Sequence, residues 1–396
     1  MQALEPLDEL FLAQDRGVTV GHSGGLTLFD ASSATRPLTA EDLRQVIEGQ
    51  LERLPVLRRR PEPDPSRPGR HRWVEDEVVD FAAHVHGHHL PGGDDRALGR
   101  LLAQINAPPL DRSRPLWEWH AIDGLEGGRV AAFLKFHHAL GDAVPGRQVV
   151  ETVFAVDGEV EEATVVGGED APAPDAAAPA SPPPSAPVTR FNQPLSGQRD
   201  FAFGSIARAR IEQIRSASAT TFTDVLLAAW AGALRGWLAL RGETPTVPLV
   251  ARLPISLRRS DDAPAGGNRL AVVPVAVPAD QGAAGARLRS AHEAMTQAKR
   301  MAAAAAGAGV ADTAGMNFAL STLKGSSRPI TWGGAKCPGA FPLAMVNVTG
   351  LAIACLTTPA NLRVSVHVDA EQVSDPWSLL RAFELALDDL ETEVAD

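Results

Sequence analysis

A stretch rich in proline and alanine near the middle of the chain limits the available folds most strongly. From Asp157 to Pro187 the residues are mostly Ala, Pro, Gly, Ser and acidic residues, and the stretch ends in APAPDAAAPASPPPSAP. Such a composition cannot bury enough apolar surface to offset the entropy of ordering the chain. The sequence therefore predicts an exposed linker over 157–189 that separates a domain at 1–156 from a domain at 190–396. A length of 396 residues agrees with two domains.

The run RVAAFLKFHHALGDAVPGRQVV, at 129–150, carries the strongest chemical pattern. Its apolar part predicts a strand over 130–136, and Asp142 is placed to cap a helix with Pro145 in its first turn. Because an imidazole titrates near neutral pH, His138 at this corner is suited to take a proton from an alcohol that attacks an activated acyl group. The H-x-x-x-D spacing by itself favours a core histidine with a capped loop, so the neighbouring residues must decide.

Composition and charge exclude several classes of protein. Charged residues make up 21% and hydrophobic residues 44% of the chain, as in a soluble globular protein, and the net charge of −11 argues against binding to nucleic acid. Two cysteines are too few for a disulfide framework and fit a reducing cytoplasm. The N-terminus is acidic where a signal peptide is basic, and no apolar run reaches membrane-spanning length. We therefore expect a cytoplasmic protein whose membrane contact is at most peripheral.

Two further patterns each allow a functional and a structural interpretation. His84, His86 and His88 occupy alternate positions, which would place them on one face of a strand and allow a metal site. No cysteine or recognised ligand spacing accompanies them, so a solvent-facing strand or loop is favoured and no metal is expected. The arginines at 58–60 similarly favour a solvated loop over a site for an anionic ligand.

Helical and strand patterns alternate in both halves, which indicates a mixed α/β class. Helix boundaries are marked by capping residues such as Thr39, and a long helix begins near Thr221 or Thr223 and ends at Gly242. The sequence further predicts helices over 39–54, 96–106, 207–216, 284–306 and 377–391, and strands over 117–122 and 247–253.

Nine segments, in their order along the chain, resemble the bacterial wax ester synthase/diacylglycerol acyltransferase family. Nonribosomal peptide condensation domains and chloramphenicol acetyltransferase-like enzymes share the HHxxxD core, but the PLW and GLEGGR segments favour the lipid family. The position of the predicted linker also agrees with that family. The segments are PLDELFL, PVLRRR, PLDRSRPLWEWHAIDGLEGGR, HHALGDA, FNQPLSGQR, TDVLLAAWAGALR, PISLR, GNR and DPW.

The resemblance implies two chloramphenicol acetyltransferase-like domains, each a mixed sheet flanked by helices, with an active-site channel at their interface. It implies an O-acyltransferase that moves a fatty acyl group from acyl-CoA to diacylglycerol or to a long-chain alcohol. Acyl-CoA would be a co-substrate and no other cofactor is expected, because a thioester is already activated. Peripheral contact with a membrane or lipid droplet would suit such hydrophobic acceptors.

The resemblance also assigns roles to individual residues. His138 would be the general base, and His137 and Asp142 would be largely architectural, with Asp142 expected to pair with Arg258 of PISLR. Thr223, in place of the family's asparagine, retains a hydroxyl that can donate a hydrogen bond near the reaction centre. The remaining residues implied are Asp224 and Arg258 as support of the site, and Pro115, Leu116, Trp117, Ser256 and Asn268 as substrate-binding residues.

The chain departs from the family pattern at three places. Ala143 stands where HHxxxDG has glycine, Thr223-Asp224 stands for Asn-Asp, and STLKGS at 321–326 replaces Ser-Asn-Val-Pro-Gly-Pro. These changes leave two alternatives beside the lipid acyltransferase. One is an acyltransferase whose acceptor is an alcohol or amine of a specialised natural product, and the other is a lipid-binding protein that has kept the fold and lost turnover.

Overall fold

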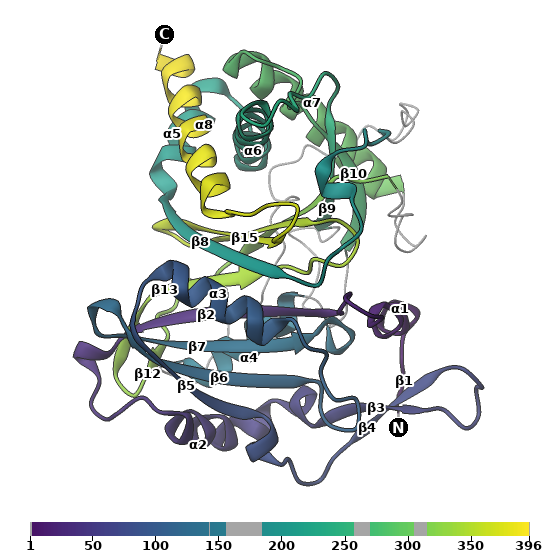
Figure 1. Ribbon diagram of the computed structural model, residues 1–396, viewed down its shortest axis with the longest axis vertical. Coiled ribbons are helices and arrows are strands. Elements are labelled where there is room, and N and C mark those ends of the chain that lie inside the picture. The colour runs from purple at the N-terminus through teal and green to yellow at the C-terminus, as the bar shows by residue number, and fades with distance from the viewer. Residues whose placement is uncertain (1, 142, 156–183, 257–269, 305–314, 396) are drawn as a thin grey trace. The chain divides into compact units, whose positions relative to one another are not determined.

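The chain folds into two compact units, each built on a mixed six-stranded sheet (Figure 1). This confirms the mixed α/β class expected from the sequence. The computed structural model describes residues 2–141, 143–155, 184–256, 270–304 and 315–395. The described parts of the first unit lie within 1–163, 195–201 and 325–347, and those of the second within 164–194, 202–324 and 348–396.

The six-stranded sheet of the first unit has the order β12-β13-β2-β7-β6-β5. β5 runs parallel to β6, and the other neighbours are antiparallel. A smaller sheet has the order β1-β4-β3. The strands are β1 (Gln2–Ala3), β2 (His22–Asp30), β3 (Arg59–Pro63), β4 (His71–Glu75), β5 (Val85–Gly93), β6 (Trp117–Leu125), β7 (Arg129–His137), β12 (Thr331–Trp332) and β13 (Ala335–Leu343).

The two faces of this sheet are covered by different helices. α2 (Ala40–Gln50) and α4 (Ala143–Phe154) pack their apolar side chains on the face that carries Trp117 and Trp119, and α3 (Asp95–Asn106) lies on the opposite side from α2 (Figure 1). The fourth helix of the unit, α1 (Pro6–Gln14), precedes β2. The predicted cap at Thr39 is confirmed, because its hydroxyl accepts a hydrogen bond from the backbone of Asp42 at 3.1 Å.

The first unit is completed by a segment from late in the chain. β13 pairs with the outer edge of β2, with Phe341 opposite Leu26, although the sequence suggested consecutive domains at 1–156 and 190–396. Local patterns mark a strand but do not say which exposed edge it will cover. Of the predicted linker at 157–189, residues 157–183 lie outside the described residues, and 184–189 have no regular structure.

Among the described residues of the second unit, the helices lie on one face of the sheet (Figure 1). The strand order is β10-β9-β11-β14-β15-β8. Among the described residues no helix is long and apolar enough to cross a lipid bilayer. The elements are β8 (Arg199–Ala207), α5 (Arg208–Ser218), α6 (Phe222–Ala239), β9 (Leu249–Ser256), β10 (Leu270–Val277), α7 (Ala284–Ala304), β11 (Phe318–Lys324), β14 (Leu351–Thr357), β15 (Asn361–Asp369) and α8 (Trp377–Ala395).

Trp332 tests whether the late segment stabilises the first unit. Its side chain is buried and packs on Phe29 and Phe154, with ring centroids 5.5 Å and 6.0 Å away. We expect Trp332→Ala to lower the free energy of unfolding of this unit by about 3–5 kcal/mol, and Trp332→Phe to cost less. Urea unfolding followed by circular dichroism measures the effect. An unchanged transition would contradict the packing role of this segment.

Candidate active site

The two adjacent histidines lie at a corner of the first unit where β7 ends. His137 is the last residue of the strand and is fully buried, whereas His138 begins a short 3-10 turn (His138–Leu140) and is partly exposed. The strand predicted over 130–136 is thus confirmed as β7. We refer to His137 and His138 as the HH corner. Of this pair, only His138 is not fully buried.

Two contacts from preceding elements hold His138. Its backbone N–H donates a hydrogen bond to the carbonyl oxygen of Gly21 at 2.8 Å. Its ring stacks on Phe11 of α1, with the ring centroids 4.6 Å apart and the planes at 28°. Helix α1 comes from the PLDELFL segment, so a residue of that segment packs directly on the His138 ring. The imidazole is therefore restricted in position before any substrate binds.

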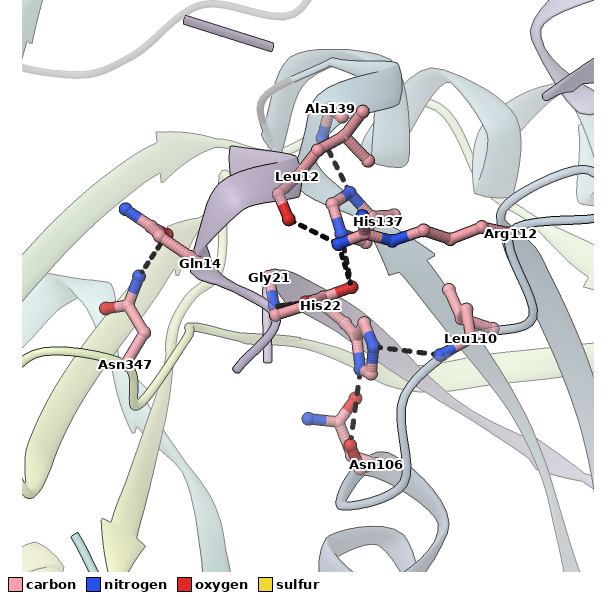
Figure 2. Close-up of polar contacts among 11 residues, drawn as sticks. Leu12, Gln14, Gly21, His22, Asn106, Leu110, Arg112, His137, Ala139 and Asn347 are labelled. Atoms are coloured by element: carbon pink, nitrogen blue, oxygen red, sulfur yellow. Dashed lines mark hydrogen bonds and ion pairs between the residues drawn. The ribbon is translucent and has the colours of Figure 1, made fainter. Parts of the chain in front are cut away.

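His137 is held on both ring nitrogens (Figure 2). Its Nδ1 accepts a hydrogen bond from the backbone N–H of Ala139 at 3.1 Å, and its Nε2 lies 3.2 Å from Oδ2 of Asp15. Since Nδ1 accepts, the ring proton is assigned to Nε2, which donates to the carboxylate. The first histidine of the motif therefore links the turn after His138 to the chain that follows α1.

Asp15 is a buried carboxylate with three donors around it. Its side chain is 7% exposed, and Oδ1 accepts from the N–H of Gly21 at 2.5 Å while Oδ2 accepts from His137 and from Arg112 at 3.2 Å. Burial by itself would raise the pKa of Asp15, but the hydrogen bonds from His137 and Gly21 hold that pKa well below its usual range. Asp15 therefore remains a carboxylate inside the protein.

His22 lies next to His137 and is also buried, with the two ring centroids 5.8 Å apart (Figure 2). Its Nε2 accepts from the N–H of Leu110 at 3.2 Å, which leaves Nδ1 to donate to the carbonyl of Asn106 at 3.3 Å. Burial and the charge of Lys135 lower the pKa of His22 to about 3. This imidazole is therefore neutral near pH 7.

A buried ion pair lies on the same sheet face. Lys135 of β7 has a side chain only 1% exposed, and its Nζ lies 3.3 Å from Oε2 of Glu118 on β6. Burial lowers the pKa of Lys135, and Glu118 partly offsets this. Burial would raise the pKa of Glu118, but its contacts with His120 and Lys135 bring it down to about 2. The buried ammonium group of Lys135 is therefore paired with the carboxylate of Glu118.

The histidines singled out as a possible metal site make other contacts. His84 is buried, its ring stacks on Trp117, and its Nδ1 lies 2.7 Å from the carbonyl oxygen of Trp117. His86 stacks on His120, and Nε2 of His88 lies 3.0 Å from Nδ1 of His120. In the part of the chain that the structure describes, no three His, Cys, Asp or Glu side chains are arranged to hold a metal ion. These rings instead form part of the sheet's packing.

Comparison with known proteins decides the family. A sequence model of the wax ester synthase/diacylglycerol acyltransferase catalytic domain matches residues 4–181, and a model of the WS/DGAT C-terminal domain matches residues 302–391. Together they cover more than half of the chain. The chain belongs to the wax ester synthase/diacylglycerol acyltransferase family.

Relatives of this family match over the full chain. The probable diacylglycerol O-acyltransferase tgs2 of Mycobacterium tuberculosis is 27% identical, over 100% of both chains. A putative diacylglycerol O-acyltransferase of the same species is 28% identical, over 99% of this chain and 100% of the relative.

Solved structures share the fold. The wax ester synthase/diacylglycerol acyltransferase from Marinobacter aquaeolei VT8 superposes with a TM-score of 0.74 at 24% identity, covering 100% of both chains. The first condensation domain of the calcium-dependent antibiotic synthetase follows, with a TM-score of 0.65 at 18% identity, covering 100% of this chain and 96% of that domain. The expected two-domain fold of chloramphenicol acetyltransferase type is thus confirmed.

The family's PLW segment lies in the core of the first unit. Pro115, Leu116 and Trp117 are buried. The carbonyl of Leu116 accepts the backbone N–H of His137 at 3.0 Å, and the indole N–H of Trp117 donates to the carbonyl of Leu57 at 2.8 Å. The sequence suggested substrate binding for these three residues. In the structure their contacts position β7 and the HH corner.

The family's Asn-Asp pair, here Thr223-Asp224, lies at the start of α6 in the second unit, whereas the HH corner belongs to the first. Both side chains are buried. Thr221, not Thr223, caps the helix, and Asp224 completes the capping box by accepting from the N–H of Thr221 at 2.8 Å. Oδ2 of Asp224 also lies 2.8 Å from Nδ1 of His292 on α7. Asp224 therefore joins the first turn of α6 to α7.

Several predicted site residues fall outside what the structure describes. Asp142, Arg258 and Asn268 lie outside the described residues, so the predicted pair of Asp142 with Arg258 stays a prediction. Ser256 is the last residue of β9, and its side chain is likewise not described.

Sequence reasoning missed the residues that surround His137. Asp15 is 122 positions away from His137 in the chain, and Arg112 is 97 positions from Asp15. The only hint in the sequence was weak. A glycine and a histidine, Gly21 and His22, stand shortly before Gly24 and Gly25 at the start of an apolar run, which is a pattern that allows close packing.

Gly21 provides a test of the corner's packing. A Cβ at this position would lie 2.8 Å from Nε2 of His137 and 2.8 Å from the carbonyl oxygen of Phe11, closer than real Cβ contacts. We expect Gly21→Ala to displace the HH corner and to cost about 1–3 kcal/mol of unfolding free energy. The matched control is Gly25→Ala in β2, whose Cβ would meet nothing closer than 3.9 Å. Equal unfolding free energies for the two variants would contradict the close approach.

The neutral state of His22 predicts a pH dependence of stability. Its pKa of about 3 in the folded protein is below the ordinary value of 6.5, so the unfolded chain binds the extra proton first as the pH falls. The stability it contributes is full above pH 6.5 and is lost as the pH falls toward 3. Between pH 7.5 and pH 5 we expect wild type to lose about 2 kcal/mol more than His22→Gln, measured by urea unfolding. Equal losses would show that His22 does not stay neutral.

Proposed function

We propose that this protein is an acyl-CoA-dependent O-acyltransferase that transfers a fatty acyl group to the hydroxyl of diacylglycerol or of a long-chain alcohol. The observation that carries the proposal is the HH corner, where His138 is partly exposed and held by Gly21 and Phe11 while His137 is buried. Membership of the acyltransferase family supports the reaction type. The two mycobacterial relatives that match over the full chain are named as diacylglycerol O-acyltransferases, which supports diacylglycerol as the acceptor.

The proposed reaction needs one base and no metal ion. His138 takes the proton from the acceptor hydroxyl as its oxygen attacks the carbonyl carbon of the acyl thioester. The tetrahedral intermediate then collapses, the carbon–sulfur bond breaks, and the leaving thiolate of coenzyme A takes the proton from His138. The products are an ester and free coenzyme A, and the base returns to its neutral form.

A neutral imidazole is required at the start of this cycle. The nearby ring of His22 is neutral near pH 7, because burial and the charge of Lys135 lower its pKa to about 3. Arg112 pairs with Asp15, and Lys135 pairs with Glu118. A general base works best when its pKa lies near the working pH.

Release of free coenzyme A tests the proposal. Purified full-length protein is supplied with a long-chain acyl-CoA and diacylglycerol, and the free thiol and the triacylglycerol are both measured. We expect His138→Ala to lower kcat by about 10²- to 10⁴-fold, because the proton acceptor is lost. His137→Ala should be milder, since its effect comes through packing.

The matched control is His89→Ala, an imidazole whose side chain is 69% exposed, which should leave turnover unchanged. A panel of acceptors, with a long-chain alcohol and a hydrophobic amine beside diacylglycerol, identifies the substrate class. Thiol release that is the same in wild type and in His138→Ala would overturn the proposal. Binding of acyl-CoA without turnover would instead favour a lipid-binding protein.

A further inference from the structure

The carboxylate of Asp15 is a buried charge that the proposed chemistry leaves unused. It comes from the turn between α1 and β2, outside the HHxxxD motif, yet it contacts the first histidine of that motif. A buried carboxylate is costly unless its oxygens accept hydrogen bonds. Its position next to a proton-transferring corner therefore calls for an explanation beyond packing.

The two carboxylate oxygens of Asp15 are connected to the backbone around His138 through two different residues. Oδ1 accepts the N–H of Gly21, and the carbonyl of the same Gly21 accepts the N–H of His138. Oδ2 accepts from Nε2 of His137, and Nδ1 of that ring accepts the N–H of Ala139. One carboxylate is thus joined, through one intervening residue on each side, to the backbone N–H groups of His138 and Ala139.

The path through His137 depends on which ring nitrogen of this residue carries the proton. With the proton on Nε2, the ring donates to Asp15 and accepts from Ala139, and both hydrogen bonds form. With the proton on Nδ1, two N–H groups would face each other at Ala139 and Nε2 would have no proton to donate to the carboxylate. A negative charge at Asp15 therefore selects the tautomer that holds the turn.

Arg112 also forms an ion pair with this carboxylate. Its Nη2 lies 3.2 Å from Oδ2 of Asp15, and its side chain is 39% exposed while that of Asp15 is 7% exposed. The guanidinium thus pairs a partly exposed cation with a buried anion. Burial and the charge of Lys135 lower the pKa of His22, so this ring does not compete for the carboxylate as a cation.

We propose that Asp15 is a positioning residue of the HH corner, which fixes His137 as the Nε2–H tautomer and, through His137 and Gly21, orients His138. The orientation of His138 for proton transfer rests on the proposed function, whereas the tautomer of His137 does not. Asp15 touches no substrate and acts only through other residues.

Asp15→Asn is the decisive substitution, because it keeps the shape and replaces one acceptor oxygen by an NH2 donor. The amide can accept from only one of Gly21 and His137, so one of the two paths fails. We expect kcat for acyl transfer to fall about 10- to 100-fold, the range typical for loss of a group that orients a functional imidazole, with KM for acyl-CoA changed less than about twofold. Asp15→Glu, which keeps the charge, should recover part of the loss.

Nitrogen-15 NMR of the imidazole rings gives a readout that a merely structural role would not move. In wild type we expect the His137 proton on Nε2, and in Asp15→Asn we expect it to shift partly or wholly to Nδ1. The matched control is Asp95→Asn, which removes one charge from a carboxylate that is 43% exposed and 2.8 Å from Arg129. It should leave both the tautomer and kcat unchanged.

A double-mutant cycle tests the path through His137. If Asp15 acts through this ring, Asp15→Asn added to His137→Ala should cost much less than it does in wild type. If the double variant instead loses kcat by the product of the two single losses, Asp15 does not act through His137. A wild-type spectrum with the proton on Nδ1 would overturn the proposal even if Asp15→Asn fails to fold. If wild type has the Nε2–H tautomer but transfers no acyl group, the proposed function fails while the link from Asp15 to His137 stands.

Discussion

The antiparallel pairing of β2 with β7 is the constraint on which the rest of the first unit depends. It places His22 opposite His137 and Gly24 opposite Lys135. Because side chains alternate between the two faces of a strand, a shift of one residue would turn His137 and Lys135 toward the apolar face that packs on α2 and α4. The close approach at Gly24, where a Cβ would lie 2.8 Å from the ring of Phe133, favours this register.

The buried ionisable groups near these strands are matched in pairs. Asp15 is matched by Arg112 and Lys135 by Glu118, and in each pair the partner comes from a different element. Burying a charge costs several kcal/mol unless it is paired and hydrogen-bonded, so both pairs tie separate segments together. The nearby imidazoles stay neutral, with the pKa of His22 lowered to about 3 and that of His120 to about 4, both mainly by burial.

Much of the local structure could be predicted from the sequence because its causes are local. Capping by Thr39, the strand that ends at the two histidines, and the long helix at α6 follow from hydrogen bonds and side-chain periodicity within a few residues. The choice between Thr221 and Thr223 as the cap needed the structure, since both have the right side chain. Asp224 decided it by completing a capping box with Thr221.

The sequence by itself determined that two mixed α/β halves flank a Pro/Ala-rich stretch and that a histidine pair ends a buried strand. Only the tertiary structure decided that His138 and not His137 is partly exposed, that Asp15 reaches a ring 122 positions away, and that β13 completes the first sheet. The reason is physical: caps and periodicity act between near neighbours, whereas these contacts form between distant segments whose meeting depends on how whole sheets pair and pack.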